Sequence, residues 1–316
     1  MLKTEIIEKI KKLKQEKNAV LLAHYYQRSE IQDIADFLGD SLQLSQAAAK
    51  TQADIIVFAG VYFMAETAKI LSPEKKVLIP DVNASCSLAD SCKADDFKQF
   101  IEQYPDYTVI SYVNTDASIK ALTDICCTSS NALQIINSLP KNEKIIFGPD
   151  KNLGNYIKSL TGHENMLIWD GACHVHEAFS VENIIALKKQ YPQAKVLAHP
   201  ECKEPVLMIA DYIGSTSALL AFSASDNANM YIVATEPGII HQMQKKSPQK
   251  EFIPVASSNA LNSEVDDSCG ACSNCEFMKL ITLEKIYDSL LNEQFEVNIE
   301  ENIRKKAEKS IIRMLG

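Results

Sequence analysis

The sequence predicts an α/β fold of three similar small α/β/α domains, each with a parallel sheet, related by pseudo-threefold symmetry. The first observation is an internal repeat, because three segments of the chain align, beginning at Val20, Val109 and Val196. The second is that each segment opens with a short aliphatic run ending on a polar ring residue, at His24, Tyr112 and His199, with intervals of 112 − 24 = 88 and 199 − 112 = 87 residues. The third is that apolar runs alternate with helical patterns such as IQDIADFL and LQLSQAAAK, which implies right-handed βαβ crossovers and parallel sheets covered by helices.

The elements follow in order from these patterns. The opening stretch MLKTEIIEKIKKLKQEKN places Ile6, Ile10 and Leu13 at helical spacing, so it predicts an amphipathic surface helix. Seventeen residues after each ring residue, a hydroxyl precedes a helical pattern and is expected to cap that helix, at Ser41, Ser129 and Thr216. Thirty-six residues after each ring residue, a second apolar run ends, at Gly60, Gly148 and Thr235.

A third apolar run completes each copy, as VLIPD (77–81), MLIWD (166–170) and FIPV (252–255). The end of the chain predicts C-terminal helices with an apolar stripe at Ile303, Ala307, Ile311 and Leu315. The predicted domains are therefore an N-terminal helix at 1–17, repeats at 18–105, 106–192 and 193–278, and C-terminal helices at 279–316.

The repeat also predicts a central pocket. Parallel sheets bind ligands beyond the carboxyl ends of their strands, which is where the three ring residues are placed. If the copies surround one axis, three rings and three helix N-termini converge on one cavity, which suits a ligand with several negative groups.

Composition excludes several classes of protein. The net charge of −9 argues against a binder of nucleic acid or anionic membranes, which would carry a basic stripe. No apolar run reaches the length of a membrane span, and the N-terminus has no signal-peptide core, so a cytoplasmic location is expected. Nine cysteines in a reducing compartment are not expected to form disulfides.

Three cysteines occupy positions that predict a cluster. Cys86 lies 62 residues after His24, and Cys173 lies 61 residues after Tyr112. The third copy has Leu261 at this register, and an apparent insertion delays its cysteines to SCGACSNC (268–275). One ligand from each unit, namely Cys86, Cys173 and one cysteine of that segment, would give three thiolates on the pocket axis.

Other metal sites stay open at this point. A ferredoxin-type run would need a fourth cysteine, and a structural zinc needs four ligands, to which His174 and His176 would have to contribute. Three thiolates on a [4Fe–4S] cluster leave one iron without a protein ligand, which points to catalysis, and to dehydration in particular, rather than to electron transfer.

Long ordered motifs along nearly the whole chain resemble the quinolinate synthase family. They include AHYYQ (23–27), GDSLQLS (39–45), SYVNTDASIKALTD (111–124), WDGACHVHE (169–177), HPEC (199–202) and CEFMK (275–279). The resemblance implies three α/β domains around an active site over a three-cysteine [4Fe–4S] cluster. It implies a condensing transferase (EC 2.5.1 class) of de novo NAD biosynthesis, which joins iminoaspartate and dihydroxyacetone phosphate into quinolinate, phosphate and water. An L-aspartate-oxidising enzyme that supplies iminoaspartate is the expected functional partner.

The resemblance also assigns residues. The third cluster ligand falls on Cys275, and the role of Cys269 and Cys272 stays open. The implied substrate-binding residues are His24, Ser41, Tyr112, Asn114, Ser129, His199, Glu201 and Thr216, and the implied catalytic residues are Glu201, Tyr26 and Tyr112. Glu201 is expected to act as a general base or acid with a raised pKa.

Two other functions are compatible with the same residues. One is a [4Fe–4S]-dependent hydro-lyase of a small hydroxy acid, which would share the open iron. The other is a cluster-based redox sensor, with Cys269 and Cys272 as its switch. Neither the oligomeric state nor the order of the chemical steps follows from the sequence.

Overall fold

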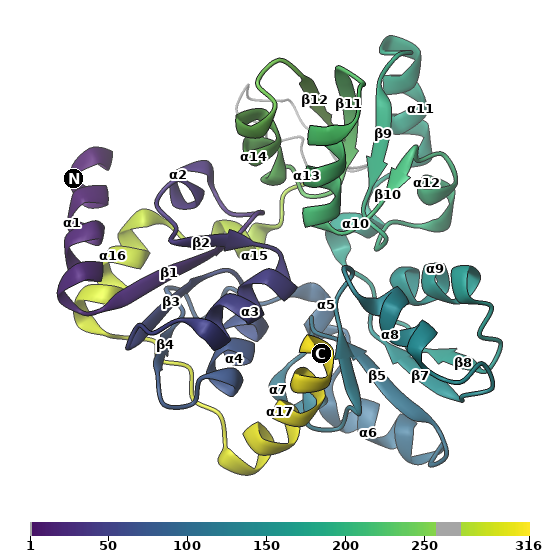
Figure 1. Cartoon of the computed structure of the whole chain (residues 1–316), viewed down its shortest axis with the longest axis horizontal. Coiled ribbons are helices and arrows are strands. Elements are labelled where there is room, and N and C mark those ends of the chain that lie inside the picture. The colour runs from purple at the N-terminus through teal and green to yellow at the C-terminus, as the bar shows by residue number, and fades with distance from the viewer. Residues whose placement is uncertain (1, 257–272) are drawn as a thin grey trace.

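The computed structural model describes residues 2–256 and 273–316. In this part of the chain, three four-stranded sheets form three lobes around a common centre (Figure 1). All strand pairs within the sheets are parallel, in the orders β2-β1-β3-β4, β6-β5-β7-β8 and β10-β9-β11-β12. The predicted α/β fold of three similar units is therefore confirmed.

The three units repeat one order of elements, in which helices and strands alternate. The first unit contains α1 (Lys3–Glu16), β1 (Ala19–His24), α2 (Ser29–Gln32), β2 (Phe37–Gly39), α3 (Ser41–Lys50), β3 (Ile55–Ala59), α4 (Tyr62–Leu71), β4 (Lys76–Leu78) and α5 (Ser87–Asp90). The second contains α6 (Ala94–Glu102), β5 (Thr108–Tyr112), α7 (Ala117–Lys120), β6 (Ile125–Cys127), α8 (Ala132–Ser138), β7 (Ile145–Gly148), α9 (Lys151–Thr161), β8 (Met166–Ile168) and α10 (His174–Glu177). The third contains α11 (Val181–Gln190), β9 (Lys195–Ala198), α12 (Glu204–Met208), β10 (Tyr212–Ile213), α13 (Thr216–Ser225), β11 (Met230–Ala234), α14 (Ile239–Lys246), β12 (Glu251–Pro254) and α15 (Glu276–Lys279). The domain boundaries drawn from the sequence stay a prediction.

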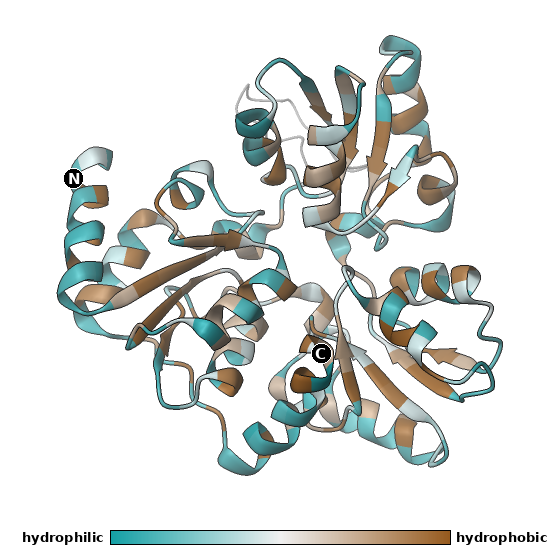
Figure 2. Ribbon diagram, viewed as in Figure 1, coloured by the Kyte–Doolittle hydropathy of each residue, from teal (hydrophilic) through white to brown (hydrophobic). Residues whose placement is uncertain are grey.

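The apolar runs form the inner strands because helices cover both faces of each sheet. Leu21, Leu22 and Ala23 of β1 are fully buried, and so are Val196, Leu197 and Ala198 of β9. Figure 2 shows the same pattern, with hydrophobic strands at the middle of each lobe and hydrophilic residues on the outer helices. Buried parallel strands read as continuous aliphatic runs, which is why the repeat was visible in the sequence.

An aspartate recurs at the same place in each unit. The Oδ2 atoms of Asp36, Asp124 and Asp211 accept hydrogen bonds from the backbone N–H groups of Leu21, Val109 and Val196, at 2.7, 2.8 and 2.7 Å. Each aspartate N–H donates in return to the carbonyl oxygen of the same strand residue. The intervals, 124 − 36 = 88 and 211 − 124 = 87, match those of the ring residues, so the repeat extends to this backbone detail.

The helical reading of IQDIADFL (31–38) was wrong beyond its first two residues. Helix α2 ends at Gln32, and Phe37–Gly39 forms the edge strand β2, which pairs with the end of β1. Asp36 decides this change, because its two hydrogen bonds to Leu21 bring the following residues alongside β1. A short edge strand of three residues is too brief to produce an alternating pattern in the sequence.

The two C-terminal helices, α16 (Leu283–Asn292) and α17 (Glu301–Leu315), pack back onto the repeats. Helix α16 lies beside α1, and α17 lies against α7 and β6 of the second unit. Ala307 and Ile311 of the predicted stripe are buried, whereas Ile303 and Leu315 are partly buried. Ser310 Oγ donates to the carbonyl oxygen of Lys120 at 2.9 Å, so α17 is fixed to the second unit.

Every helix in the described part of the chain is too short or too polar to span a bilayer. The predicted insertion in the third unit, with Leu261, Cys269 and Cys272, lies outside the described residues.

Candidate active site

One cavity lies where the strand ends of the three units meet. All twelve residues that the sequence analysis selected line it: His24, Tyr26, Ser41, Cys86, Tyr112, Asn114, Ser129, Cys173, His199, Glu201, Thr216 and Cys275. The cavity also exposes side chains that were not selected, among them Asp40, His176 and Glu236. The convergence follows from topology, because the carboxyl ends of all strands in a parallel sheet share one edge.

The two histidines are held in one tautomer by their own loops. His24 ends β1, and its Nδ1 accepts the backbone N–H of Tyr26 at 3.1 Å. His199 follows β9, and its Nδ1 accepts the backbone N–H of Glu201 at 3.4 Å. In both rings the Nε2 atom therefore carries the hydrogen, and in His199 it lies 3.2 Å from Ser129 Oγ. Both rings are N–H donors available at the cavity.

Burial also keeps both rings uncharged. It lowers the pKa of His24 to about 4, although the Asp40 carboxylate opposes the shift. Burial likewise lowers the pKa of His199 to about 3, with Glu201 opposing. At neutral pH both imidazoles are neutral donors.

These histidine shifts predict a loss of stability in acid. The unfolded chain takes up a proton on His24 near pH 6.5, but the folded chain does so only near pH 4, so the free energy of unfolding falls as the pH drops through this window. We expect His24→Gln, which cannot titrate, to lose less stability than the parent between about pH 7 and about pH 5 in urea unfolding. Equal losses in the two proteins would contradict the shifted pKa of His24.

The predicted helix caps were wrong, and the reason explains why the hydroxyls are available. Ser41 and Thr216 are the first residues of α3 and α13, and the caps are their predecessors, Asp40 and Ser215. Ser129 lies two residues before the cap of α8, Asn131. The three hydroxyls are therefore released from capping and line the cavity.

Asn114 has an unsatisfied acceptor in this cavity. Its Oδ1 atom is buried and has no hydrogen-bond partner among the described residues. A buried polar atom without a partner costs free energy, so its position is explained if a ligand or water supplies the missing bond.

The three thiols occupy equivalent positions. Cys86, Cys173 and Cys275 each directly precede a four-residue helix, α5, α10 and α15, the last element of each unit. These short helices lie toward the centre where the lobes meet (Figure 1). Backbone N–H groups of each helix bond to the sulfur before it: Leu88 and Ala89 to Cys86, His176 to Cys173, and Phe277 and Met278 to Cys275.

Burial raises the pKa of all three thiols, to about 12 for Cys86 and about 11 for Cys275, and well above its usual value for Cys173. Neighbouring thiols raise the pKa of Cys86 and Cys173 further, and Glu236 raises that of Cys275, so three thiolates would need a bound cation here. Thiolates that accept backbone N–H bonds are the ligands of iron–sulfur clusters, so the donor set fits such a group.

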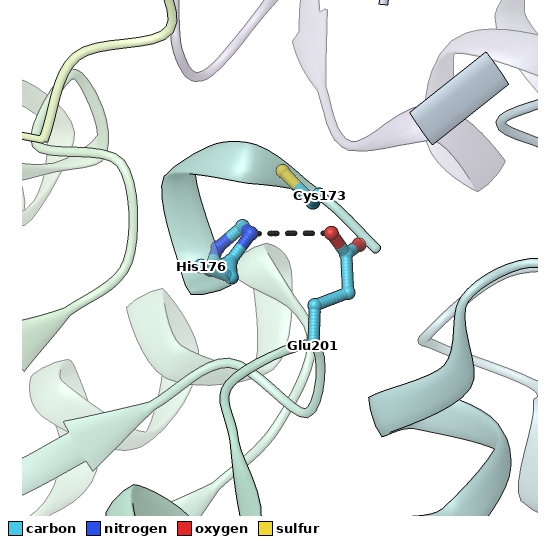
Figure 3. A group of neighbouring side chains, drawn as sticks. All are labelled: Cys173, His176 and Glu201. Atoms are coloured by element: carbon cyan, nitrogen blue, oxygen red, sulfur yellow. Dashed lines mark ion pairs between the residues drawn. The ribbon is translucent and has the colours of Figure 1, made fainter. Parts of the chain in front are cut away.

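A second donor set overlaps the first. Ligand atoms of Cys173, His176 and Glu201 lie within 4.8 Å of one another (Figure 3). A mixed set of sulfur, nitrogen and oxygen is typical of a single zinc ion rather than of an iron–sulfur cluster. The sets share Cys173, so they cannot both be filled.

Glu201 differs from its expected ionisation. Burial by itself raises its pKa, but the hydrogen bonds from the His176 ring and the Tyr112 hydroxyl outweigh burial and lower the pKa below its usual value. Tyr112 Oη donates to Oε1 of Glu201 at 2.6 Å, and His176 Nδ1 lies 3.1 Å from Oε2. The expectation of a raised pKa was therefore wrong, and the side chain is ionised at neutral pH.

Two residues that the sequence analysis did not select connect Glu201 to Tyr26. His176 Nε2 lies 2.9 Å from Thr235 Oγ1, and Thr235 Oγ1 lies 2.8 Å from Tyr26 Oη. Tyr26 Oη also bonds to Thr216 Oγ1 at 2.8 Å. A buried chain of polar contacts thus runs from Glu201 to Tyr26. In the repeat, Thr235 occupies the position of Gly60 and Gly148. The replacement of glycine by a residue with a hydroxyl was therefore the sequence signal that could have identified Thr235.

Gly238 packs directly against this chain. A Cβ atom there would lie 2.8 Å from Tyr26 Cα and 2.7 Å from Glu236 Oε2. The Gly238 N–H donates to that same oxygen at 2.7 Å, and Lys279 Nζ lies 2.8 Å from Glu236 Oε1. The space for Tyr26 thus depends on the missing side chain.

We expect Gly238→Ala to displace Tyr26 and lower turnover by roughly 10- to 100-fold, as small misplacements of reacting groups do. Gly162→Ala is the control, because a Cβ there meets nothing within 4 Å and its positive φ of 65° affects only the end of α9. Parent-like turnover in Gly238→Ala would contradict the tight packing.

Comparison with known proteins shows the family of the chain. A family model described as quinolinate synthetase A protein matches residues 8–316. A protein of Microcystis aeruginosa named quinolinate synthase is 56% identical over 311 residues, covering 98% of this chain and 94% of that protein. Proteins of the same name from Chloroherpeton thalassium and from a Synechocystis species are each 54% identical, covering 98% and 99% of this chain and 94% and 95% of theirs.

Proposed function

The chain belongs to the quinolinate synthetase A protein family, and from this premise we propose that it is a quinolinate synthase of NAD biosynthesis. The proposed reaction joins iminoaspartate to dihydroxyacetone phosphate and gives quinolinate, phosphate and two molecules of water. The observation that carries the proposal is that twelve residues, selected from three distant parts of the sequence, line one cavity.

The cluster of the proposal is [4Fe–4S], held by Cys86, Cys173 and Cys275. Their equivalent positions before α5, α10 and α15 favour this set over the mixed set of Cys173, His176 and Glu201. When bound, such a cluster supplies an iron without a protein ligand, which is a Lewis acid for the loss of a hydroxyl group.

The chain binds the dicarboxylate with neutral donors. None of the described residues that line the cavity is a lysine or an arginine. The three carboxylates that also line it already have partners in the protein: Lys279 for Glu236, the Tyr112 hydroxyl for Glu201, and the Ser130 and Ser217 hydroxyls for Asp40. Hydrogen bonds to the substrate are left to the His24 ring, the Asn114 amide, the hydroxyls of Ser41 and Ser129, and the first N–H groups of α3 and α13, which have no partner within their helices.

Proton transfer is assigned to the buried polar chain. Glu201 is ionised at neutral pH, so it accepts a proton from a carbon or nitrogen of the bound substrate during condensation and ring closure. The hydroxyl of Tyr112 stabilises that carboxylate and occupies the same side of the cavity. Burial raises the pKa of Tyr26 well above its usual value, so Tyr26 keeps its proton and acts as a donor to the triose substrate.

The deciding experiment uses anaerobically prepared protein that contains about four irons per chain. Iminoaspartate is generated in place from L-aspartate by an L-aspartate-oxidising enzyme, the proposed functional partner, and dihydroxyacetone phosphate is added. We expect quinolinate by mass spectrometry and an equal amount of phosphate. If no quinolinate forms although the cluster is intact, the proposal is wrong. Dehydration of malate or citrate would then favour the hydro-lyase, and oxygen-dependent binding of a partner without turnover would favour the sensor.

A further inference from the structure

Asp40 lies where the three units meet. It is 5% exposed and directly precedes α3. Its Oδ1 atom accepts the backbone N–H of Gln43 at 3.1 Å, which caps the helix of its own unit. Its Oδ2 atom accepts the hydroxyl of Ser130 from the second unit at 2.9 Å and the hydroxyl of Ser217 from the third. One carboxylate therefore joins loops that lie 130 − 40 = 90 and 217 − 40 = 177 residues away.

The partners of Asp40 are the sequence neighbours of the cavity hydroxyls. Asp40 precedes Ser41, Ser130 follows Ser129, and Ser217 follows Thr216. Adjacent Cα atoms are about 3.8 Å apart, so fixing one residue of each pair restricts the place of the other. The hydroxyls of Ser41, Ser129 and Thr216 line the cavity in equivalent positions, and their mutual spacing depends on how the three loops meet.

We propose that Asp40 is a positioning residue, which holds Ser41, Ser129 and Thr216 at the spacing that receives the dicarboxylate. This inference rests on the proposed function and adds to it a residue that does not need to touch the substrate in order to set its binding. Helix capping alone does not account for Asp40, because capping uses only Oδ1. Within residues 2–256 and 273–316, Oδ2 accepts hydrogen bonds only from the hydroxyls of the other two units, those of Ser130 and Ser217.

The residue type suits this task. An ionised carboxylate offers two oxygens that accept several hydrogen bonds and donates none. Bonds to a charged acceptor are shorter and stronger than neutral ones. The three donors also satisfy a carboxylate that is almost fully buried, which would otherwise be costly. A serine at the same place would still cap α3, since serine and aspartate are similar N-caps, but it has no second oxygen to reach the other units.

Two variants remove the junction from opposite sides. Asp40→Ser keeps the cap and loses the acceptor, whereas the double variant Ser130→Ala/Ser217→Ala keeps the acceptor and loses both donors from the other units. We expect each to weaken binding of quinolinate, measured by calorimetry, by roughly tenfold or more, which corresponds to one or two hydrogen bonds to a charged group. The triple variant Asp40→Ser/Ser130→Ala/Ser217→Ala is expected to bind quinolinate no more weakly than either of these variants, because all of them break the same junction.

The control is Ser180→Ala, which removes the cap of α11 but no contact between units. It should lose some thermal stability and keep the parent affinity. Iron content should stay the same in all variants, which separates positioning from a lost cofactor.

Parent-like affinity in Asp40→Ser would overturn the proposal, and so would additive losses in the triple variant. A deficit in Asp40→Ser that the double serine variant does not share would restrict Asp40 to capping, which also overturns it. The same set of variants can also be compared by their free energies of unfolding, and that comparison does not depend on the ligand. If it shows coupling while the parent neither binds nor forms quinolinate, the proposed function fails and the junction itself stands.

Discussion

Cys86→Ser, Cys173→Ser and Cys275→Ser are each expected to abolish assembly of the [4Fe–4S] cluster. Each thiol belongs to the residue immediately before the last short helix of its unit, and each sulfur accepts backbone N–H bonds from that helix. A serine at any of the three leaves two sulfurs for a cluster that needs three. Iron content and the absorption spectrum of anaerobically purified protein measure the loss.

The matched control is Cys202→Ser. Cys202 is a fully buried thiol next to Glu201 in the chain, but it does not line the cavity, and its sulfur donates to the carbonyl oxygen of Ala234 at 3.4 Å. That variant should keep its iron. Cys269→Ser and Cys272→Ser, at positions outside the described residues, are also expected to keep it. Loss of iron in Cys269→Ser together with retention in Cys275→Ser would show that the wrong cysteine was assigned in the third unit.

Glu201→Gln is expected to lower turnover by roughly 10²- to 10⁴-fold while leaving the cluster and the binding of the dicarboxylate intact. Glutamine keeps an oxygen that accepts the Tyr112 hydroxyl, so the shape of the cavity is retained. It cannot take up a proton, and it removes one negative charge, so affinity for a dicarboxylate should be kept or increased. Rapid anaerobic quenching and mass spectrometry should then reveal an intermediate short of quinolinate.

Glu177→Gln is the control for that change. Glu177 is the last residue of α10, its carboxylate accepts the Asn152 side-chain amide at 2.8 Å, and it does not line the cavity. The same Asn152 amide also donates to the backbone oxygen of Glu201, so both glutamates share a neighbour and only one faces the cavity. If Glu201→Gln forms quinolinate at nearly the parent rate with its iron in place, the role of base moves to another residue, with Tyr26 the first candidate.

The features that the sequence predicted correctly depend on local pattern and regular spacing. The inner strands are runs of aliphatic residues because both faces of each parallel sheet are buried. The repeat of 88 and 87 residues places His24, Tyr112 and His199 at equivalent strand ends, and parallel topology brings those ends to one edge. That reasoning gathered these three rings, the three hydroxyls that follow them, Cys86 and Cys173 at one cavity without any structure, whereas Tyr26, Asn114, Glu201 and Cys275 were implied only by the family resemblance.

Features that the sequence did not predict depend on contacts between distant parts of the chain. In the first and third units the helix cap is the residue before the cavity hydroxyl, not the residue that carries the hydroxyl. Asp40 in addition accepts hydrogen bonds from all three units. Such hydrogen-bond partners cannot be predicted from composition or from the repeat, because a difference of a few tenths of an ångström decides whether a hydrogen bond forms.

The ionisation of Glu201 is the clearest example. From the sequence, an acidic residue beside apolar walls was expected to have a raised pKa, since burial disfavours charge. Only the tertiary structure places the Tyr112 hydroxyl and the His176 ring against that carboxylate, and their hydrogen bonds outweigh the cost of burial. The sequence by itself determined that the three ring residues and the three hydroxyls of the repeat meet at one cavity, because strand ends follow from periodicity. The tertiary structure decided their ionisation and their hydrogen-bond partners, because these depend on neighbours that no local pattern encodes.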